Sequence, residues 1–171
     1  MAAWQWPSYF DPETKMQGIT LDIADWRRPS PESAPVQAKA AGLYMICTLA
    51  KHTAERKGFQ DALMLDYRGY VAEATGANIF FLMNDGKIHT PKADCFLDGI
   101  TRRTVIELAK QAGLEVVERH ILPDELENAR EAFLTGTAAE ITPISKIGDY
   151  NFKPDTACRT LVEAYTNVTN S

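Results

Sequence analysis

The chain contains 171 residues, of which 45% are hydrophobic and 24% are charged. This composition is typical of a globular protein, and the length allows one domain with a sizeable core. The formal net charge of −5 argues against a nucleic-acid-binding protein, which needs a basic surface to contact phosphates. We therefore expect a protein that acts on small molecules and has no nucleic-acid partner.

The N-terminal region, MAAWQWPSYFDPE, lacks a basic segment followed by an apolar one, and no run of about 18 apolar residues occurs in the chain. We therefore expect a cytoplasmic protein without a membrane partner. Cys47, Cys95 and Cys158 are widely scattered, which predicts buried thiols rather than disulfides or a zinc site. The histidines are equally dispersed, so we predict no metal site.

The first predicted elements are two strands and a connecting loop between Ala2 and Ile23, followed by a Pro/Ser-rich connection, RRPSPESAP. Its arginines, Arg27 and Arg28, could contact a phosphate, but beside several prolines a solvated loop or a surface ion pair is favoured. Apolar residues at helical spacing then predict a helix from residues 36 to 57, ended by Gly58 and with Lys39 in its first turn.

A series of β signals follows the predicted helix. The segments ALMLDY, GYVAEAT, NIFFLM and KIHTP are bounded by glycines and an NDG turn, which predicts an antiparallel meander. GITRRTVIELAKQAGLEVVERHI predicts a helix ended by Gly113 and then a strand, and PDELENA predicts a short acidic helix. EAFLTGT predicts a strand, AAEITPISKIGDY a loop and a small strand, and TACRTLVEAYTNV a closing helix. Strands that neighbour one another favour an α+β domain with a mixed sheet or pseudobarrel.

Two segments place an ionisable side chain among small residues. Lys39, in VQAKAAGLY, either stands on the solvent face of a helix or serves as a working amine with free space around it. Glu73, in GYVAEATGAN, is by strand alternation an outward-facing carboxylate.

Two further segments offer backbone N–H groups to an anion. In FLDGITRRT, Gly99 precedes a helix whose first N–H groups, at Ile100 and Thr101, have no partner within the helix. In LTGTAAEITP, Gly136 allows a close approach of the backbone, and Thr137 adds a hydroxyl. Each of these signals also occurs in ordinary loops.

In combination, the segments resemble the class IV, or fold-type IV, pyridoxal-phosphate aminotransferases, and most closely the branched-chain amino acid aminotransferases. AKAAGLY, GYVAEATGANIF, DGITRRTVIELAK and FLTGTAAEITPI carry the resemblance, which covers essentially the whole chain. It implies the D-amino acid aminotransferase-like fold, with a mixed sheet or pseudobarrel, and pyridoxal 5'-phosphate as the cofactor. It also implies transamination of leucine, isoleucine or valine with 2-oxoglutarate, in a homodimer or higher homo-oligomer.

The resemblance implies roles for individual residues. Lys39 matches the lysine that binds the cofactor covalently and then moves a proton at the substrate Cα, and Glu73 matches the carboxylate that pairs with the pyridine nitrogen. The other implied contacts are Tyr44 with the phenolic oxygen, Leu97 with the ring face, Ile100, Thr101 and Thr137 with the phosphate, and the backbone of Ala138 and Ala139 with the substrate carboxylate.

The family that the chain resembles also has a smaller N-terminal domain, which supplies an arginine to the cofactor phosphate. Nothing in residues 1–171 corresponds to it, so we expect these residues to form the large, cofactor-binding domain and to transaminate poorly by themselves. Two alternatives remain open: a non-catalytic cofactor-binding fragment, and a related class IV enzyme that acts on D-amino acids or primary amines.

Overall fold

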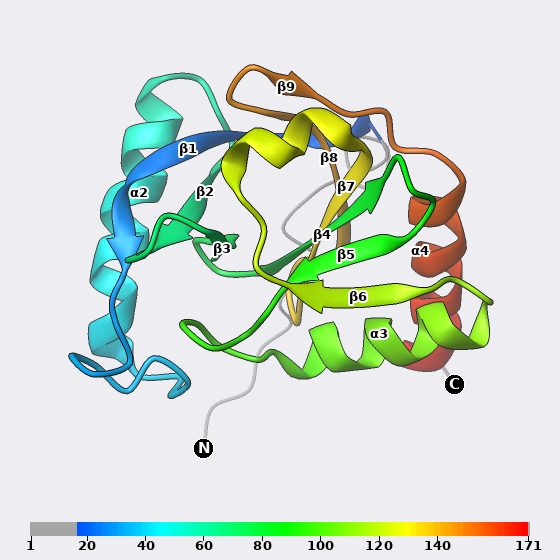
Figure 1. Cartoon of the computed structure of the whole chain (residues 1–171), viewed down its shortest axis with the longest axis horizontal. Coiled ribbons are helices and arrows are strands. Elements are labelled where there is room, and N and C mark those ends of the chain that lie inside the picture. The colour runs from blue at the N-terminus through cyan, green and yellow to red at the C-terminus, as the bar shows by residue number, and fades with distance from the viewer. Residues whose placement is uncertain (1–16, 171) are drawn as a thin grey trace.

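A curled nine-stranded sheet organises residues 17–170, which are the residues that the computed structural model describes (Figure 1). The strands are β1 (Ile19–Arg28), β2 (Asp61–Asp66), β3 (Val71–Ala74), β4 (Asn78–Met83), β5 (Ile88–Pro91), β6 (Val116–Arg119), β7 (Ala129–Gly136), β8 (Glu140–Ile147) and β9 (Tyr150–Asn151). The helices are η1 (Ala41–Tyr44), α2 (Met45–Arg56), α3 (Ile100–Gln111), η2 (Pro123–Asn128) and α4 (Thr156–Thr169).

The sheet is mixed, as the sequence predicts. Its strand order is β3-β2-β1-β8-β7-β4-β5-β6, with β9 paired to β8. β1 runs parallel to both β2 and β8, and β5 runs parallel to β6, whereas the remaining pairs are antiparallel. The fold is therefore built from both local hairpins and connections that cross the sheet.

The predicted meander is wrong at its centre. β2 pairs with β3 and β4 pairs with β5, but β3 is an edge strand and the second partner of β4 is β7. All six residues of β4 are buried, which suits a strand with neighbours on both sides. The apolar sequence of β4 indicates that the strand is buried, but it does not identify β7 as the distant strand that pairs with it.

The central strands of the sheet contribute to two apolar clusters, one on each face, and a third cluster lies between α2 and strands β1 and β2. On β7, Leu134 points into the cluster inside the curl, together with Ile79 and Phe81. Its neighbour Phe133 belongs to the cluster covered by α3 and α4, where it stacks on Phe80 with ring centroids 5.1 Å apart. Burial on both faces explains why the central strands are continuously apolar rather than alternating.

The predicted helix before the meander begins later than expected. Ala40 is extended, with φ −98° and ψ 132°, so Lys39 precedes the helix instead of lying in its first turn. The residues at helical spacing begin only at Leu43, and Gly42 would weaken a longer helix. Gly58, with φ +88°, ends α2 as predicted, because this backbone conformation suits glycine.

Most of the remaining local predictions are confirmed. α3 starts after Gly99 and stops before Gly113, α4 is the closing helix, and the acidic segment forms η2. The strand predicted as small is the eight-residue β8. The first of the two strands predicted before Ile23 lies outside the described residues. All three cysteines are free and buried, as predicted. Within residues 17–170, no helix is both long and apolar enough to cross a membrane.

Candidate active site

A cavity of about 370 Å³ lies where the ends of β3 and β7 and the start of β4 meet the first turn of α3. Its volume falls within the range of small-molecule sites. Most of the predicted site residues line this cavity, namely Lys39, Tyr44, Glu73, Leu97, Ile100, Thr101 and Thr137. Segments that are far apart in the sequence are therefore brought to one place.

Ala138 and Ala139 are placed differently. They follow Thr137 in the turn between β7 and β8, but neither is among the described residues that line the cavity. The Ala139 side chain is packed in the cluster inside the curl, and its carbonyl accepts a hydrogen bond from Thr142 Oγ1 at 2.6 Å. The structure therefore places these alanines beside the cavity.

Lys39 lines the cavity from a segment without regular structure. Lys39 is exposed and lies just before η1, and Tyr44, the last residue of η1, is half-buried. Among the described residues, Lys39 is the one lysine that lines the cavity. Its positive charge is close enough to Glu73 to affect the ionisation of that carboxyl group.

Glu73, which lines the cavity, forms a buried ion pair with Arg28. Arg28 Nε lies 3.3 Å from Glu73 Oε1, and the two residues are 4% and 8% exposed. Arg28 Nη1 also donates to the Leu43 carbonyl at 3.2 Å and contacts Cys47 Sγ at 3.3 Å. The expectations of an outward-facing Glu73 and a solvated Arg28 are therefore wrong. β3 is buried on both faces, and Arg28 ends β1 beneath α2.

Burial dominates the ionisation of this carboxyl group. It raises the pKa of Glu73 to about 8, against the opposing influence of the positive charges of Arg28 and Lys39. Burial likewise raises the pKa of the Cys47 thiol, although Arg28 acts to lower it. A carboxyl group with a pKa near neutrality, facing a cavity, is suited to accept a hydrogen bond from a cationic group that enters with a ligand.

The start of α3 also lines the cavity. Gly99 is the N-cap residue, and no side chain caps this helix within the described residues. The first N–H groups of the helix, including those of Ile100 and Thr101, therefore lack partners within α3 and carry the positive end of its dipole. This arrangement is suited to an anion.

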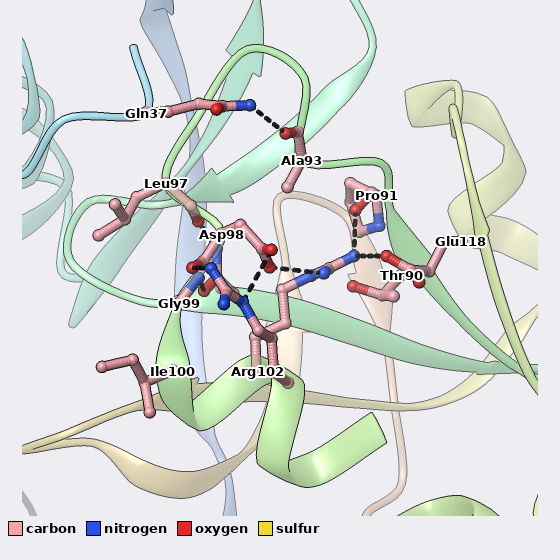
Figure 2. A network of polar contacts seen from close by, with 12 residues as sticks. Gln37, Thr90, Pro91, Ala93, Leu97, Asp98, Gly99, Ile100, Arg102 and Glu118 are labelled. Atoms are coloured by element: carbon pink, nitrogen blue, oxygen red, sulfur yellow. Dashed lines mark hydrogen bonds and ion pairs between the residues drawn. The ribbon is translucent and has the colours of Figure 1, made fainter. Parts of the chain in front are cut away.

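Arg102 holds the loop that leads into α3 (Figure 2). Its guanidinium group is buried and donates to Asp98 Oδ1 at 2.9 Å, to the Pro91 carbonyl at 3.0 Å and to Glu118 Oε2 at 2.7 Å. Pro91 and Asp98 stand at the two ends of the loop. Arg102 therefore ties together the ends of the segment that carries Leu97.

Three buried polar residues that line the cavity were not singled out in the sequence, namely Thr75, Asn78 and Thr135. Asn78 and Thr135 line the cavity and are register partners on β4 and β7. Thr135 Oγ1 has no hydrogen-bond partner, which costs about 1–3 kcal/mol unless a ligand or solvent provides one. For Asn78, the signal in the sequence was a polar residue at the start of the otherwise apolar segment NIFFLM.

Comparison with curated proteins identifies close relatives. A family model described as amino-transferase class IV matches residues 1–147. The protein of Rickettsia felis named "Probable branched-chain-amino-acid aminotransferase" is 46% identical over 136 residues, which cover 80% of this chain and 47% of the relative. The branched-chain-amino-acid aminotransferase of Escherichia coli (strain K12) is 40% identical over 148 residues, which cover 86% of this chain and 48% of the relative.

Solved structures agree with this relationship. The crystal structure of the T.th. branched-chain amino acid aminotransferase with pyridoxamine 5'-phosphate has a TM-score of 0.90 at 38% identity, over 96% of this chain and 54% of that one. The Escherichia coli branched-chain amino acid aminotransferase has a TM-score of 0.92 at 35% identity, over 98% of this chain and 56% of that one.

These comparisons confirm the predicted fold, a mixed, curled sheet with flanking helices. The chain spans about half the length of the curated relatives it matches. Because the family model matches most of the chain and the structural similarity extends over nearly all of it, the chain belongs to the class IV aminotransferases.

Proposed function

We propose that this chain binds pyridoxal 5'-phosphate in the cavity and contributes to transamination between branched-chain amino acids and 2-oxoglutarate. One observation carries the proposal: a single cavity brings together the Lys39 amine, the buried Glu73 carboxyl and the uncapped start of α3. These are the groups needed to bind an aldehyde, a pyridine nitrogen and a phosphate, respectively.

The lining residues fit this cofactor. The buried Thr135 hydroxyl lacks a partner, and a ligand with polar atoms can provide one. The start of α3 offers N–H groups to a phosphate, with Thr137 also lining the cavity. Glu73 also lines the cavity, is held by Arg28 and can accept a hydrogen bond from a protonated ring nitrogen. The cavity therefore has the polarity expected for a ring with a phosphate at one end.

When bound, pyridoxal phosphate supplies a ring that accepts the electrons released at the substrate Cα. In our proposal, the Lys39 amine would hold the cofactor at its aldehyde carbon and would also serve as the base for the Cα proton of the substrate. Glu73 would hold a proton on the ring nitrogen. Pairing with that cation favours the ionised carboxylate and opposes the effect of burial on the pKa of Glu73.

Tyr44 and Leu97 complete the proposed cofactor contacts, with the phenolic oxygen and the ring face respectively, because both line the cavity. Ile100, Thr101 and Thr137 are proposed to bind the phosphate. The backbone of Ala138 and Ala139 remains our prediction for the substrate carboxylate. Their position in the turn next to Thr137 is compatible with this role.

The choice of branched-chain substrates is supported by the names of the relatives in Rickettsia felis and Escherichia coli. The large-domain assignment of residues 1–171, the homo-oligomeric state and the cytoplasmic location remain predictions. A non-catalytic cofactor-binding role and activity on D-amino acids or primary amines are the alternatives that the experiment below distinguishes.

The proposal is tested by adding pyridoxal phosphate to the purified protein, reducing with borohydride and mapping the labelled peptide. We expect the adduct on Lys39 and its loss in Lys39→Ala, whereas Lys92→Ala, at an exposed lysine outside the cavity, should retain it. A principal adduct on another lysine would contradict the assignment.

Substrate class is then tested by adding leucine, a D-amino acid or a primary amine to the unreduced protein and following the absorbance. Conversion of the cofactor to its amine form with leucine supports our proposal. Conversion only with a D-amino acid or a primary amine supports a related activity. An adduct on Lys39 that responds to none of these donors supports the non-catalytic role.

A further inference from the structure

Asn78 contacts both Glu73 and the segment that leads into α3, which belong to the proposed cofactor site. It is the first residue of β4, lines the cavity and is 5% exposed. Its amide nitrogen donates to the Leu97 carbonyl at 2.8 Å and lies 3.4 Å from Glu73 Oε2. Its amide oxygen accepts a hydrogen bond from the Gly99 N–H at 3.2 Å. One short side chain therefore joins the buried carboxylate to the segment that starts α3.

The close approach of Gly99 provides an independent sign of this fit. A Cβ atom added at Gly99 would lie 2.3 Å from Asn78 Oδ1, which is far too close for non-bonded atoms. The backbone of Gly99 has φ −65° and ψ 143°, a conformation that any residue adopts. A side chain at this position would therefore displace the Asn78 amide, although the backbone conformation itself would allow it.

From these contacts we infer that Asn78 is a positioning residue, which sets the placement of Glu73 relative to the Leu97–Gly99 segment. The inference rests on the proposed function, in which Glu73 pairs with the ring nitrogen and the start of α3 binds the phosphate. The pyridine ring is rigid and the arm that carries the phosphate is short, so both ends can be engaged only within a narrow range of separations. An amide is suited to this position because it donates on one side and accepts on the other.

Two substitutions separate positioning from simple packing. Asn78→Asp keeps the shape and the acceptor for Gly99, but it loses the donor and places a second carboxyl group beside Glu73. Asn78→Ala removes both hydrogen-bonding functions. Asn84→Ala is the matched control, because Asn84 is exposed in the turn that follows β4.

Pyridoxal phosphate affinity should fall by about tenfold or more in both Asn78 variants and remain unchanged in Asn84→Ala. In the two Asn78 variants, the pH midpoint of the absorbance of the lysine adduct should shift in opposite directions. Asn78→Asp adds negative charge and raises the midpoint, whereas Asn78→Ala removes a donor from Glu73, favours its neutral form and lowers the midpoint. A residue that only fills space would not produce opposite shifts.

The Gly99 contact is tested with a double-mutant cycle. Gly99→Ala alone should weaken pyridoxal phosphate binding, because its Cβ displaces the Asn78 amide. In the Asn78→Ala background the same change should have a much smaller effect, since the clashing oxygen is gone. Thermal unfolding of each variant without cofactor provides a second reading of the same coupling, which does not depend on ligand binding.

The outcomes separate a failure of the proposed function from a failure of the role inferred for Asn78. If the unsubstituted protein forms no adduct on Lys39, the proposed function fails, whereas coupling in the unfolding data would still support the contact itself. If the adduct forms and both Asn78 variants match the unsubstituted protein in affinity and pH midpoint, the inference is overturned. Additive effects of Gly99→Ala and Asn78→Ala in both measurements would overturn it as well.

Discussion

Glu73 shows how burial changes the chemistry of a single side chain. In a strand exposed on one face it would be an ordinary surface carboxylate, but β3 is covered on both faces and Glu73 is 8% exposed. Arg28 at 3.3 Å provides a partner for the charge, and burial nevertheless raises the pKa of Glu73 to about 8. The site therefore contains a carboxyl group that can exchange a proton near neutral pH.

This raised pKa predicts a pH-dependent stability in the absence of cofactor. Between about pH 4.5 and pH 8 the folded protein binds the Glu73 proton more tightly than the unfolded chain does, so stability falls as pH rises through this window. Glu73→Gln should remove this contribution and show a flatter dependence. The free energy of unfolding is measured by urea titration at several pH values, with exposed Glu127→Gln as the control. Parallel curves for Glu73→Gln and the unsubstituted protein would contradict the assignment.

At the scale of elements, two polar networks hold the loop of residues 92–98, which leads from β5 into α3. Arg102 joins its ends on one side (Figure 2). On the other side, Asp94 contacts Arg68 at 2.8 Å and His120 at 2.8 Å. Asp66, Asp94 and Cys95 also place their ligand atoms within 4.8 Å of one another, but the Arg68 guanidinium contacts all three. This arrangement favours a structural ion-pair network.

Arg102 should be important for stability. Arg102→Ala removes a fully buried side chain and its bonds to Pro91, Asp98 and Glu118, so we expect a loss of roughly 2–5 kcal/mol in the free energy of unfolding. Arg103→Ala is a suitable control, because its side chain is 65% exposed and pairs with the same Asp98. That variant should stay within about 0.5 kcal/mol. Equal losses in both variants would show that burial of Arg102 has no special effect.

The Asp94 network should make the protein sensitive to acid. Burial acts to raise the pKa of Asp94, but hydrogen bonds from Arg68 and His120 outweigh it and lower the pKa to about 2. The ionised carboxylate therefore stabilises the fold above about pH 4, and this contribution is lost as pH falls towards 2. In thermal unfolding at several pH values, Asp94→Asn should lose less stability over this range than the unsubstituted protein. Exposed Asp124→Asn should behave like the unsubstituted protein, and a similar acid response in Asp94→Asn would exclude this contribution.

At the scale of the whole molecule, the curled sheet supports an apolar cluster on each face, and β7 contributes to both. Phe133 packs against Phe80 on the side of α3 and α4, while the adjacent Leu134 lies inside the curl. The cavity forms at the end of these central strands, where β7 gives way to the turn at Thr137. The position of the site therefore depends on the packing of the entire sheet.

Truncation of a large side chain in this core should strongly reduce the free energy of unfolding. Phe133 is fully buried, so Phe133→Ala is expected to reduce the free energy of unfolding by about 3–5 kcal/mol. Phe133→Leu leaves a smaller cavity and should cause a clearly smaller loss. Chemical unfolding of the three proteins checks this order, and equal losses for alanine and leucine would show that the site relaxes around the missing ring.

The sequence by itself determined the local elements and the family. Apolar spacing and bounding glycines predicted α3, α4 and most strands, because these signals act over a few residues. The motifs around Lys39, Glu73, Gly99 and Thr137 identified segments that the structure gathers in one cavity. Each motif is a short stretch whose residue types are visible without knowledge of its neighbours in space.

Only the tertiary structure determines which residues far apart in the sequence contact one another. Strand alternation could not reveal that β4 pairs with β7, nor that Arg28 at the end of β1 faces Glu73 on β3. The bridge from Asn78 to Leu97 and Gly99 likewise exists only after the sheet has closed against the start of α3. These contacts depend on long-range packing, and that packing also supplies the burial that raises the pKa of Glu73.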